Sequence, residues 1–121
     1  SLVAGAPIFT QMKLLDSTVS LCHSKTKSIE SLTKYSDIII SAVGKPDLID
    51  SKMIKKDSII IDVGINVIND EEDNLNLKYK NNTNGNSNNV IVGDVNFIDV
   101  IEKCKYISPV PNGVGRMTVI M

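Results

Sequence analysis

The sequence predicts an α/β fold with a doubly wound, mostly parallel sheet. Two segments share one pattern, in which a run of isoleucines precedes a glycine: residues 37–44 (DIIISAVG) and 58–66 (SIIIDVGIN). Such runs are typical of parallel strands covered on both faces, and parallel strands require crossovers between them. Sheets of this class bind ligands at the carboxyl ends of their strands, so we expect a site at residues 43–44 and 64–66.

Length and composition narrow the class of protein. The 121 residues, 42% of them hydrophobic, predict one domain over residues 1–121. The chain opens without Met and stops inside an apolar pattern, so we expect it to be truncated at both ends. A net charge of −1 argues against nucleic acid or a membrane as the main partner. Two cysteines without metal-like spacing and no long apolar run predict an intracellular protein, cytoplasmic rather than organellar.

The first half of the chain alternates between helices and strands. A helix begins at Pro7, and its apolar positions recur at helical spacing, so one face is expected to pack on the sheet. Residues 18–22 predict a strand, residues 28–35 a short helix, and residues 37–44 the next strand. Asp50 is expected to cap one helical turn that leads into the strand at 58–66, the centre of the sheet.

The second half begins with a change of composition. Residues 67–89 are rich in Asn, Asp, Glu and Lys and predict a mobile, low-complexity surface insertion. Order is expected to return with a strand at 90–94, followed by a helix capped by Asn96 that runs to Cys104.

The carboxyl-terminal part is expected to change from strand to loop to helix. Residues 106–108 predict a last strand, and the Pro and Gly of residues 109–115 exclude regular structure. The loop leads into a helix at 116–121. Five strands are predicted in all, and a sixth is expected before Ser1, where it would present the first helix to a pyrophosphate.

The polar turn at His23–Thr26 bears on the choice of cofactor. It follows the predicted second strand, where folds of this Rossmann type recognise the adenosine ribose and where NAD-preferring sites carry Asp or Glu. Ser24, Lys25 and Thr26 supply hydroxyl and ammonium groups that suit a 2′-phosphate, so NADP is favoured over NAD. The alternative is a solvated turn without a ligand.

No catalytic or metal-ligating residues are predicted. Asp62 and Asp94 stand near strand ends, where a carboxylate more often caps a neighbouring loop than acts in catalysis. No metal cluster, Ser-His-Asp order or Cys-His pair can be assembled from the sequence.

Six motifs occur in one order along the chain. They are Ser1-x-x-x-Gly5-x-Pro7, Cys22-His-Ser-Lys-Thr26, residues 37–46 (DIIISAVGKP), residues 60–66 (IIDVGIN), Val92-Gly-Asp-Val95 and residues 109–118 (PVPNGVGRMT). Together they resemble the nicotinamide-binding domain of the bifunctional methylenetetrahydrofolate dehydrogenase/cyclohydrolase (FolD) family. The resemblance implies an enzyme that oxidises 5,10-methylenetetrahydrofolate with NADP and hydrolyses the product to 10-formyltetrahydrofolate.

The resemblance also implies roles for single residues. Cofactor-binding residues by this match are Ser1, Ser24, Lys25, Thr26, Val43, Gly44, Pro46, Gly64, Ile65 and Thr118. The loop between folate and cofactor is implied to hold Pro109, Val110, Pro111 and Gly113. Asn112 and Arg116 depart from the family, which commonly has Gly and Pro there.

The catalytic residues of the family lie outside the match. Its Tyr-x-x-x-Lys belongs to a folate-binding amino-terminal domain, and no such motif occurs here. The resemblance therefore implies a folate substrate held through that other domain, and a homodimer, because similar proteins pair through this domain. The alternatives are a non-catalytic dinucleotide-binding module and another Rossmann-type dehydrogenase, such as a shikimate-type enzyme.

Overall fold

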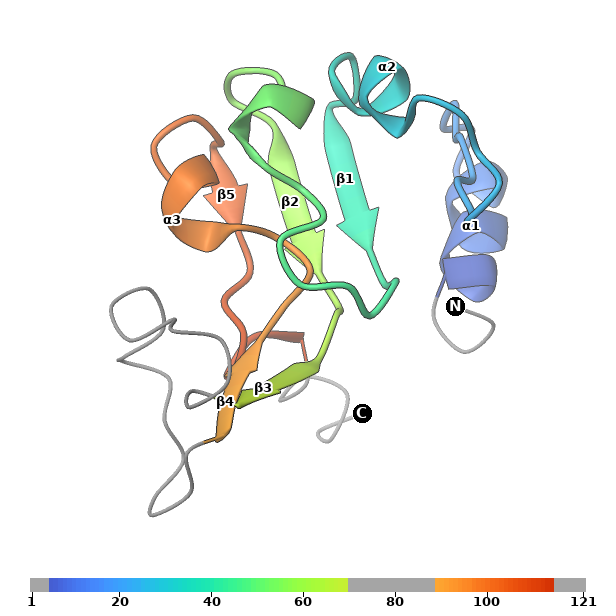
Figure 1. The fold of residues 1–121 in the computed structure, drawn as a ribbon. Coiled ribbons are helices and arrows are strands. Elements are labelled where there is room, and N and C mark those ends of the chain that lie inside the picture. Colours follow the sequence, from blue (N-terminus) through green and yellow to red (C-terminus); the bar gives the residue numbers. More distant parts are fainter. Residues whose placement is uncertain (1–4, 70–88, 115–121) are drawn as a thin grey trace.

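Three parallel strands form the centre of the computed structural model, which describes residues 5–69 and 89–114 (Figure 1). They are β1 (Ile38–Ser41), β2 (Ile59–Asp62) and β5 (Tyr106–Ile107), in the order β1-β2-β5. In the parallel register of β1 and β2, Ser41 lies opposite Asp62, so both strands end at one edge. The predicted parallel sheet and the central position of the strand at 58–66 are confirmed.

Four helical segments lie wholly within the described part of the chain. They are α1 (Gly5–Leu14), α2 (Ile29–Thr33), the 3-10 turn η1 (Ser51–Met53) and α3 (Phe97–Val100). The predicted cap of η1 is confirmed, since the Asp50 carboxylate accepts a hydrogen bond from the Lys52 N–H at 3.0 Å. The helix predicted to reach Cys104 is shorter, and Asn96 makes no side-chain capping bond to it.

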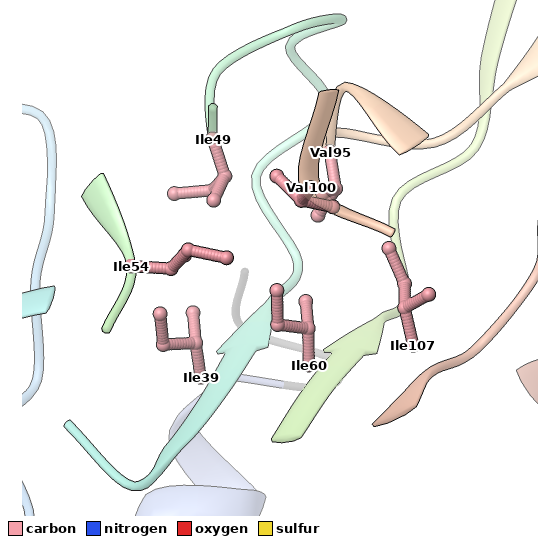
Figure 2. Close-up of a cluster of buried hydrophobic side chains, with 7 residues drawn as sticks. All are labelled: Ile39, Ile49, Ile54, Ile60, Val95, Val100 and Ile107. Atoms are coloured by element: carbon pink, nitrogen blue, oxygen red, sulfur yellow. The ribbon is translucent and has the colours of Figure 1, made fainter. Parts of the chain in front are cut away.

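The core covers one face of the sheet (Figure 2). Its strand residues are Ile39, Ile60 and Ile107, and its other members are Ile49, Ile54, Val95 and Val100. Burial alternates along β1 and β2, where every second residue is buried and the residues between are half-buried or exposed. The expectation of strands fully covered on both faces is therefore wrong for the described part of the chain, because the other face packs less completely.

A separate antiparallel pair lies beyond the carboxyl ends of the sheet (Figure 1). It joins β3 (Asn66–Asn69) to β4 (Asn89–Val92), and it has a small core of Ile68, Val90 and Val92. The strand predicted at 90–94 thus exists but does not join the parallel sheet. Residues 67–69 and Asn89, assigned to the insertion from composition, are strand residues, because Val67 and Ile68 suit cross-strand pairing. The rest of the insertion lies outside the described residues.

Two further expectations fail on the β1 side. Residues 18–22 do not form a strand, since a strand needs a hydrogen-bonded neighbour and none lies beside them in the described ranges. The helix α1 forms as predicted, yet none of its residues is buried, and it stands beyond the β1 edge in Figure 1. The described sheet ends at β1, and the apolar residues Ile8 and Met12 of α1 are only half-buried.

Residues 109–113 of the loop after β5 are irregular, as their Pro and Gly content predicts, but Val114 is already helical and residue 115 lies outside the described residues. The helix expected at 116–121, and with it Thr118, lies outside the described residues, as does Ser1. No helix within residues 5–69 and 89–114 is long and apolar enough to span a membrane.

Candidate functional site

A buried polar residue stands at the carboxyl end of each parallel strand. Ser41 ends β1, Asp62 ends β2 and Ser108 follows β5, and each is at most 4% exposed. The Asp62 N–H donates to Ser108 Oγ at 2.7 Å, and the Ser41 hydroxyl donates to Asp94 at 2.9 Å. Because buried polar groups must find partners, these bonds determine where the loops after the strands begin.

Asp94 holds the loop after β1. Its carboxylate accepts three consecutive backbone N–H groups, from Val43 at 2.8 Å, Gly44 at 3.1 Å and Lys45 at 3.0 Å. The chain can turn around the carboxylate in this way because Gly44 adopts a φ of 81°, which costs glycine little. The loop at 43–46 is therefore shaped by a side chain 50 residues away.

The same carboxylate reaches the loop after β2. The Asn66 amide donates to Asp94 Oδ1 at 3.1 Å. Gly64 packs so closely that a Cβ atom there would lie 2.2 Å from that oxygen, so only glycine fits. Residues 43–44 and 64–66, expected from sequence to share one site, are brought together by Asp94.

Asp62 holds the backbone on which Gly64 and Asp94 stand. Its carboxylate accepts the N–H groups of Gly64 at 3.0 Å, Asp94 at 3.1 Å and Val95 at 3.0 Å. A Cβ atom on Gly93 would lie 2.0 Å from Asp62 Oδ2, which requires glycine there as well. The structural role predicted for Asp62 and Asp94 is confirmed.

The two carboxylates differ in their electrostatics. Burial raises the pKa of Asp62 above the ordinary aspartate value, against the lowering effect of its three N–H bonds, and the nearby Asp94 charge adds to the rise. Burial also acts to raise the pKa of Asp94, but the bonds from Val43, Asn66 and its other donors outweigh burial and lower the pKa. Asp94 is thus the member of the pair whose charge the fold stabilises.

Apolar side chains project from the two anchored loops. Val43 is 58% exposed and Ile65 is 66% exposed, and Gly44 and Pro46 are exposed as well. Large aliphatic side chains this exposed, directly beside buried polar anchors, are well suited to pack against a flat ring. The predicted residues Val43, Gly44, Pro46 and Ile65 therefore line one edge of the sheet, and Gly64 lies buried beneath it.

The loop after β5 begins at the same edge, because Ser108 bonds to both Asp62 and Ile60 of β2. Pro109 is exposed, while Val110, Pro111 and Gly113 are half-buried. A Cβ atom on Gly113 would lie 2.1 Å from the Pro109 carbonyl oxygen, so the loop folds tightly on itself.

Hydrogen bonds between its first and last residues, His23 and Thr26, close the turn at 23–26. The His23 N–H donates to Thr26 Oγ1 at 2.9 Å, and the Lys25 N–H donates to His23 Nδ1 at 3.2 Å. The Ser24 and Lys25 side chains are exposed, whereas the Thr26 hydroxyl is used in the turn. Of the three predicted phosphate ligands, Ser24 and Lys25 are thus the two most available.

Sequence reasoning missed the organising role of Asp94, and also Ser41 and Ser108. One signal was present, since each of the three strands places a polar residue directly after its isoleucines. No group of three or more His, Cys, Asp or Glu suited to a metal ion occurs in the described part of the chain.

Comparison with known proteins finds relatives that match nearly the whole of this chain. The bifunctional protein FolD of Thermodesulfovibrio yellowstonii is 40% identical over 121 residues, and that of Mycoplasma capricolum is 46% identical over 119 residues. The matches cover 100% and 98% of this chain, and in both cases 36% of the relative. The chain thus spans about a third of the length of these relatives.

A solved structure is similar in fold as well as in sequence. The Trypanosoma brucei methylenetetrahydrofolate dehydrogenase-cyclohydrolase, complexed with NADP cofactor and inhibitor, is 36% identical, with a TM-score of 0.78 over 96% of this chain and 36% of that one. The NAD(P)-binding domain model of tetrahydrofolate dehydrogenase/cyclohydrolase matches residues 1–121. These matches favour the folate enzymes over a shikimate-type dehydrogenase or an unrelated module, and the chain belongs to the tetrahydrofolate dehydrogenase/cyclohydrolase NAD(P)-binding domain family.

Proposed function

We propose that this chain binds NADP within an enzyme that oxidises 5,10-methylenetetrahydrofolate to the 5,10-methenyl form and hydrolyses that to 10-formyltetrahydrofolate. Membership of an NAD(P)-binding domain family and the NADP complex of the trypanosomal relative support the cofactor. The names of the bacterial relatives support the bifunctional activity.

One observation carries the proposal: two exposed aliphatic side chains, Val43 and Ile65, stand at the ends of adjacent parallel strands on loops held by one buried carboxylate. Folds of this class bind dinucleotides at the carboxyl ends of adjacent parallel strands, which is where these two side chains stand. Ser24 and Lys25 offer a hydroxyl and an ammonium group for a 2′-phosphate. The residues present therefore fit NADP better than NAD.

In this proposal the chain positions the reactants. NADP, when bound, supplies the acceptor for the hydride. Val43, Gly44 and Pro46 hold the adenosine side and Gly64 and Ile65 the nicotinamide side. Pro109, Val110, Pro111 and Gly113 then separate cofactor from folate and exclude water between them, and Ser1 and Thr118, outside the described residues, complete the cofactor site.

We place the catalytic groups and most folate contacts in another domain, since the chain corresponds to about a third of its relatives. Holding the reacting atoms in register is worth about 7–11 kcal/mol of barrier, and only one wall of the cleft belongs to this chain. We further propose a homodimer, which the resemblance to the family implies, and a cytoplasmic location. A net charge of −1 favours the absence of nucleic-acid or membrane partners.

Cofactor selectivity tests the proposal. In the full-length protein, Ser24→Asp with Lys25→Ala should weaken NADP binding at least tenfold and leave NAD binding within about threefold, because charge-assisted bonds contribute about 1.5–3 kcal/mol each. The matched control is Lys27→Ala with Ser28→Asp, which makes the same charge change on exposed residues just outside the turn. Equal losses for both cofactors, or an equal effect of the control, would place the 2′-phosphate elsewhere.

NADPH formation from 5,10-methylenetetrahydrofolate tests whether the catalytic groups lie in another domain. Residues 1–121 alone should show no turnover beside the full-length protein. Turnover within about tenfold of full length, a deficit of only about 1.4 kcal/mol, would mean that this domain carries the catalytic group.

A further inference from the structure

We propose that Asp94 is a positioning residue that couples the two cofactor-facing loops, so that a change in one loop alters the order of the other. The coupling concerns the protein alone, and its effect on NADP binding rests on the proposed function. Nothing in the family match or in the names of the relatives assigns a role to this residue.

The contacts of Asp94 are divided between the loops. Oδ2 accepts from the Ser41 hydroxyl and the Val43 N–H, and Oδ1 accepts from Gly44, Lys45 and the Asn66 amide. Oδ1 therefore has donors from both loops at 3.0–3.1 Å. Asp94 is fully buried at 0% exposure, so it acts on a ligand only through these loops.

The backbone of Asp94 is itself held, which prevents it from following either loop. Its N–H donates to Asp62 at 3.1 Å, and its carbonyl accepts the Ile49 N–H at 3.2 Å. Gly64 fills the remaining space against the carboxylate. A shift at one donor must therefore change the bonds to the others, because neither the main chain nor the side chain has room to move independently.

The number of donors explains why the residue is an aspartate. A carboxylate offers two acceptor oxygens with about four lone-pair sites, whereas an asparagine amide offers one oxygen and presents its own NH₂ donor. In Asp94→Asn that NH₂ would face donors of Ser41 and Val43 or of Gly44, Lys45 and Asn66. With the NH₂ at the Oδ1 position, the bonds from Gly44, Lys45 and Asn66 are lost; with the NH₂ at the Oδ2 position, the bonds from Ser41 and Val43 are lost. Either orientation therefore removes at least two of the five bonds that hold the loops.

Amide hydrogen exchange in the ligand-free, full-length protein tests the coupling directly. Asn66→Ala removes a donor after β2, yet it should raise exchange at residues 43–45, which Asn66 does not bond, at least threefold. Asn96→Ala is the matched control, because this side chain makes no capping bond and the same chemical change is made next to the cluster. Unchanged exchange at 43–45 in Asn66→Ala, or an equal rise in Asn96→Ala, would overturn the proposal.

Asp94→Asn should raise exchange at both loops and weaken NADP binding, measured by calorimetry, at least tenfold. Ile60→Val, a change in the core at 0% exposure, controls for lost stability. Measurements are made where circular dichroism shows all variants folded, and NADP affinity equal to that of Ile60→Val would refute the role in binding. If Asp94→Asn does not fold, Asn66→Ala still decides the coupling. If wild-type protein does not bind NADP, the proposed function fails, and exchange alone decides the coupling.

Discussion

Gly64→Ala should be among the most damaging single-methyl additions in the described part of this domain. The new Cβ atom would lie 2.2 Å from Asp94 Oδ1, 2.3 Å from its Cγ and 2.6 Å from Oδ2. Ordinary carbon contacts begin near 3.4 Å, so the carboxylate would have to move by about 1 Å or more. Since that carboxylate is held by five hydrogen bonds, it cannot rotate away freely.

The expected magnitude follows from these bonds. A movement of this size breaks at least two of them, and hydrogen bonds to charged groups contribute about 1.5–3 kcal/mol each. Gly64→Ala should therefore cost about 3 kcal/mol or more, a large share of the roughly 5–15 kcal/mol that stabilises a typical domain. Cofactor affinity should fall as well, because both loops depend on the displaced carboxylate.

Two other glycines provide graded controls. Gly44 has a φ of 81°, and no atom lies within 4 Å of the place a Cβ would take, so Gly44→Ala should cost only the backbone strain of about 1–2 kcal/mol. Gly5 in α1 has open space and no positive φ, so Gly5→Ala should be neutral or stabilising by up to about 1 kcal/mol. Chemical denaturation of the full-length variants gives the order, and a Gly64→Ala loss within about 1 kcal/mol of Gly44→Ala would refute the reasoning.

Three further outcomes are expected. The pKa of Asp94 is lowered in the folded state, so the ionised carboxylate stabilises the fold above the ordinary aspartate pKa, and this stabilisation is lost as the pH falls through the pKa of the folded state. In acid unfolding, the free energy of unfolding of the wild type should therefore fall over this pH range, and that of Asp94→Asn should lack this part of the fall. Asn112 has a φ of 77°, so Asn112→Gly should stabilise the fold slightly, by up to about 1 kcal/mol in chemical denaturation, and a loss would mean that the asparagine side chain has a role in the loop. Replacing residues 75–88 with a short Gly/Ser linker should cost less than about 2 kcal/mol in thermal unfolding, because low-complexity composition adds little to a core; the replacement stops before Asn89, which pairs in β4. A larger loss would contradict the compositional prediction.

Local patterns determined much of this molecule. The aliphatic runs at 37–44 and 58–66 become β1 and β2 because isoleucine-rich segments ending in glycine have few other ways to bury their side chains. Asp50 caps η1 through a bond between residues two apart, which needs no tertiary context. The motifs that indicate the family are equally local, and the family match confirms them.

Composition was a weaker guide at the borders of elements. The Asn-rich composition concealed strand β3 and the first residue of β4, since pairing of Val67 with Ile91 and of Ile68 with Val90 depends on two segments far apart in sequence. Residues 18–22 have strand-like side chains but no neighbour to pair with in the described ranges. A strand forms only where a second segment pairs with it, whereas a side-chain pattern describes one segment alone.

The sequence by itself determined the two central parallel strands and the glycine-containing loops that follow them, although β1 and β2 end earlier than predicted, at Ser41 and Asp62. Only the tertiary structure decided that Asp94 holds the loops after β1 and β2, because its partners lie up to 53 residues away and no periodicity links them. The glycines at 64 and 93 were likewise visible as glycines, but the need for them comes from carboxylates that pack against their Cα atoms. Contacts between distant segments depend on how the chain brings its strand ends together, and that arrangement is set by packing of the whole core rather than by any local preference.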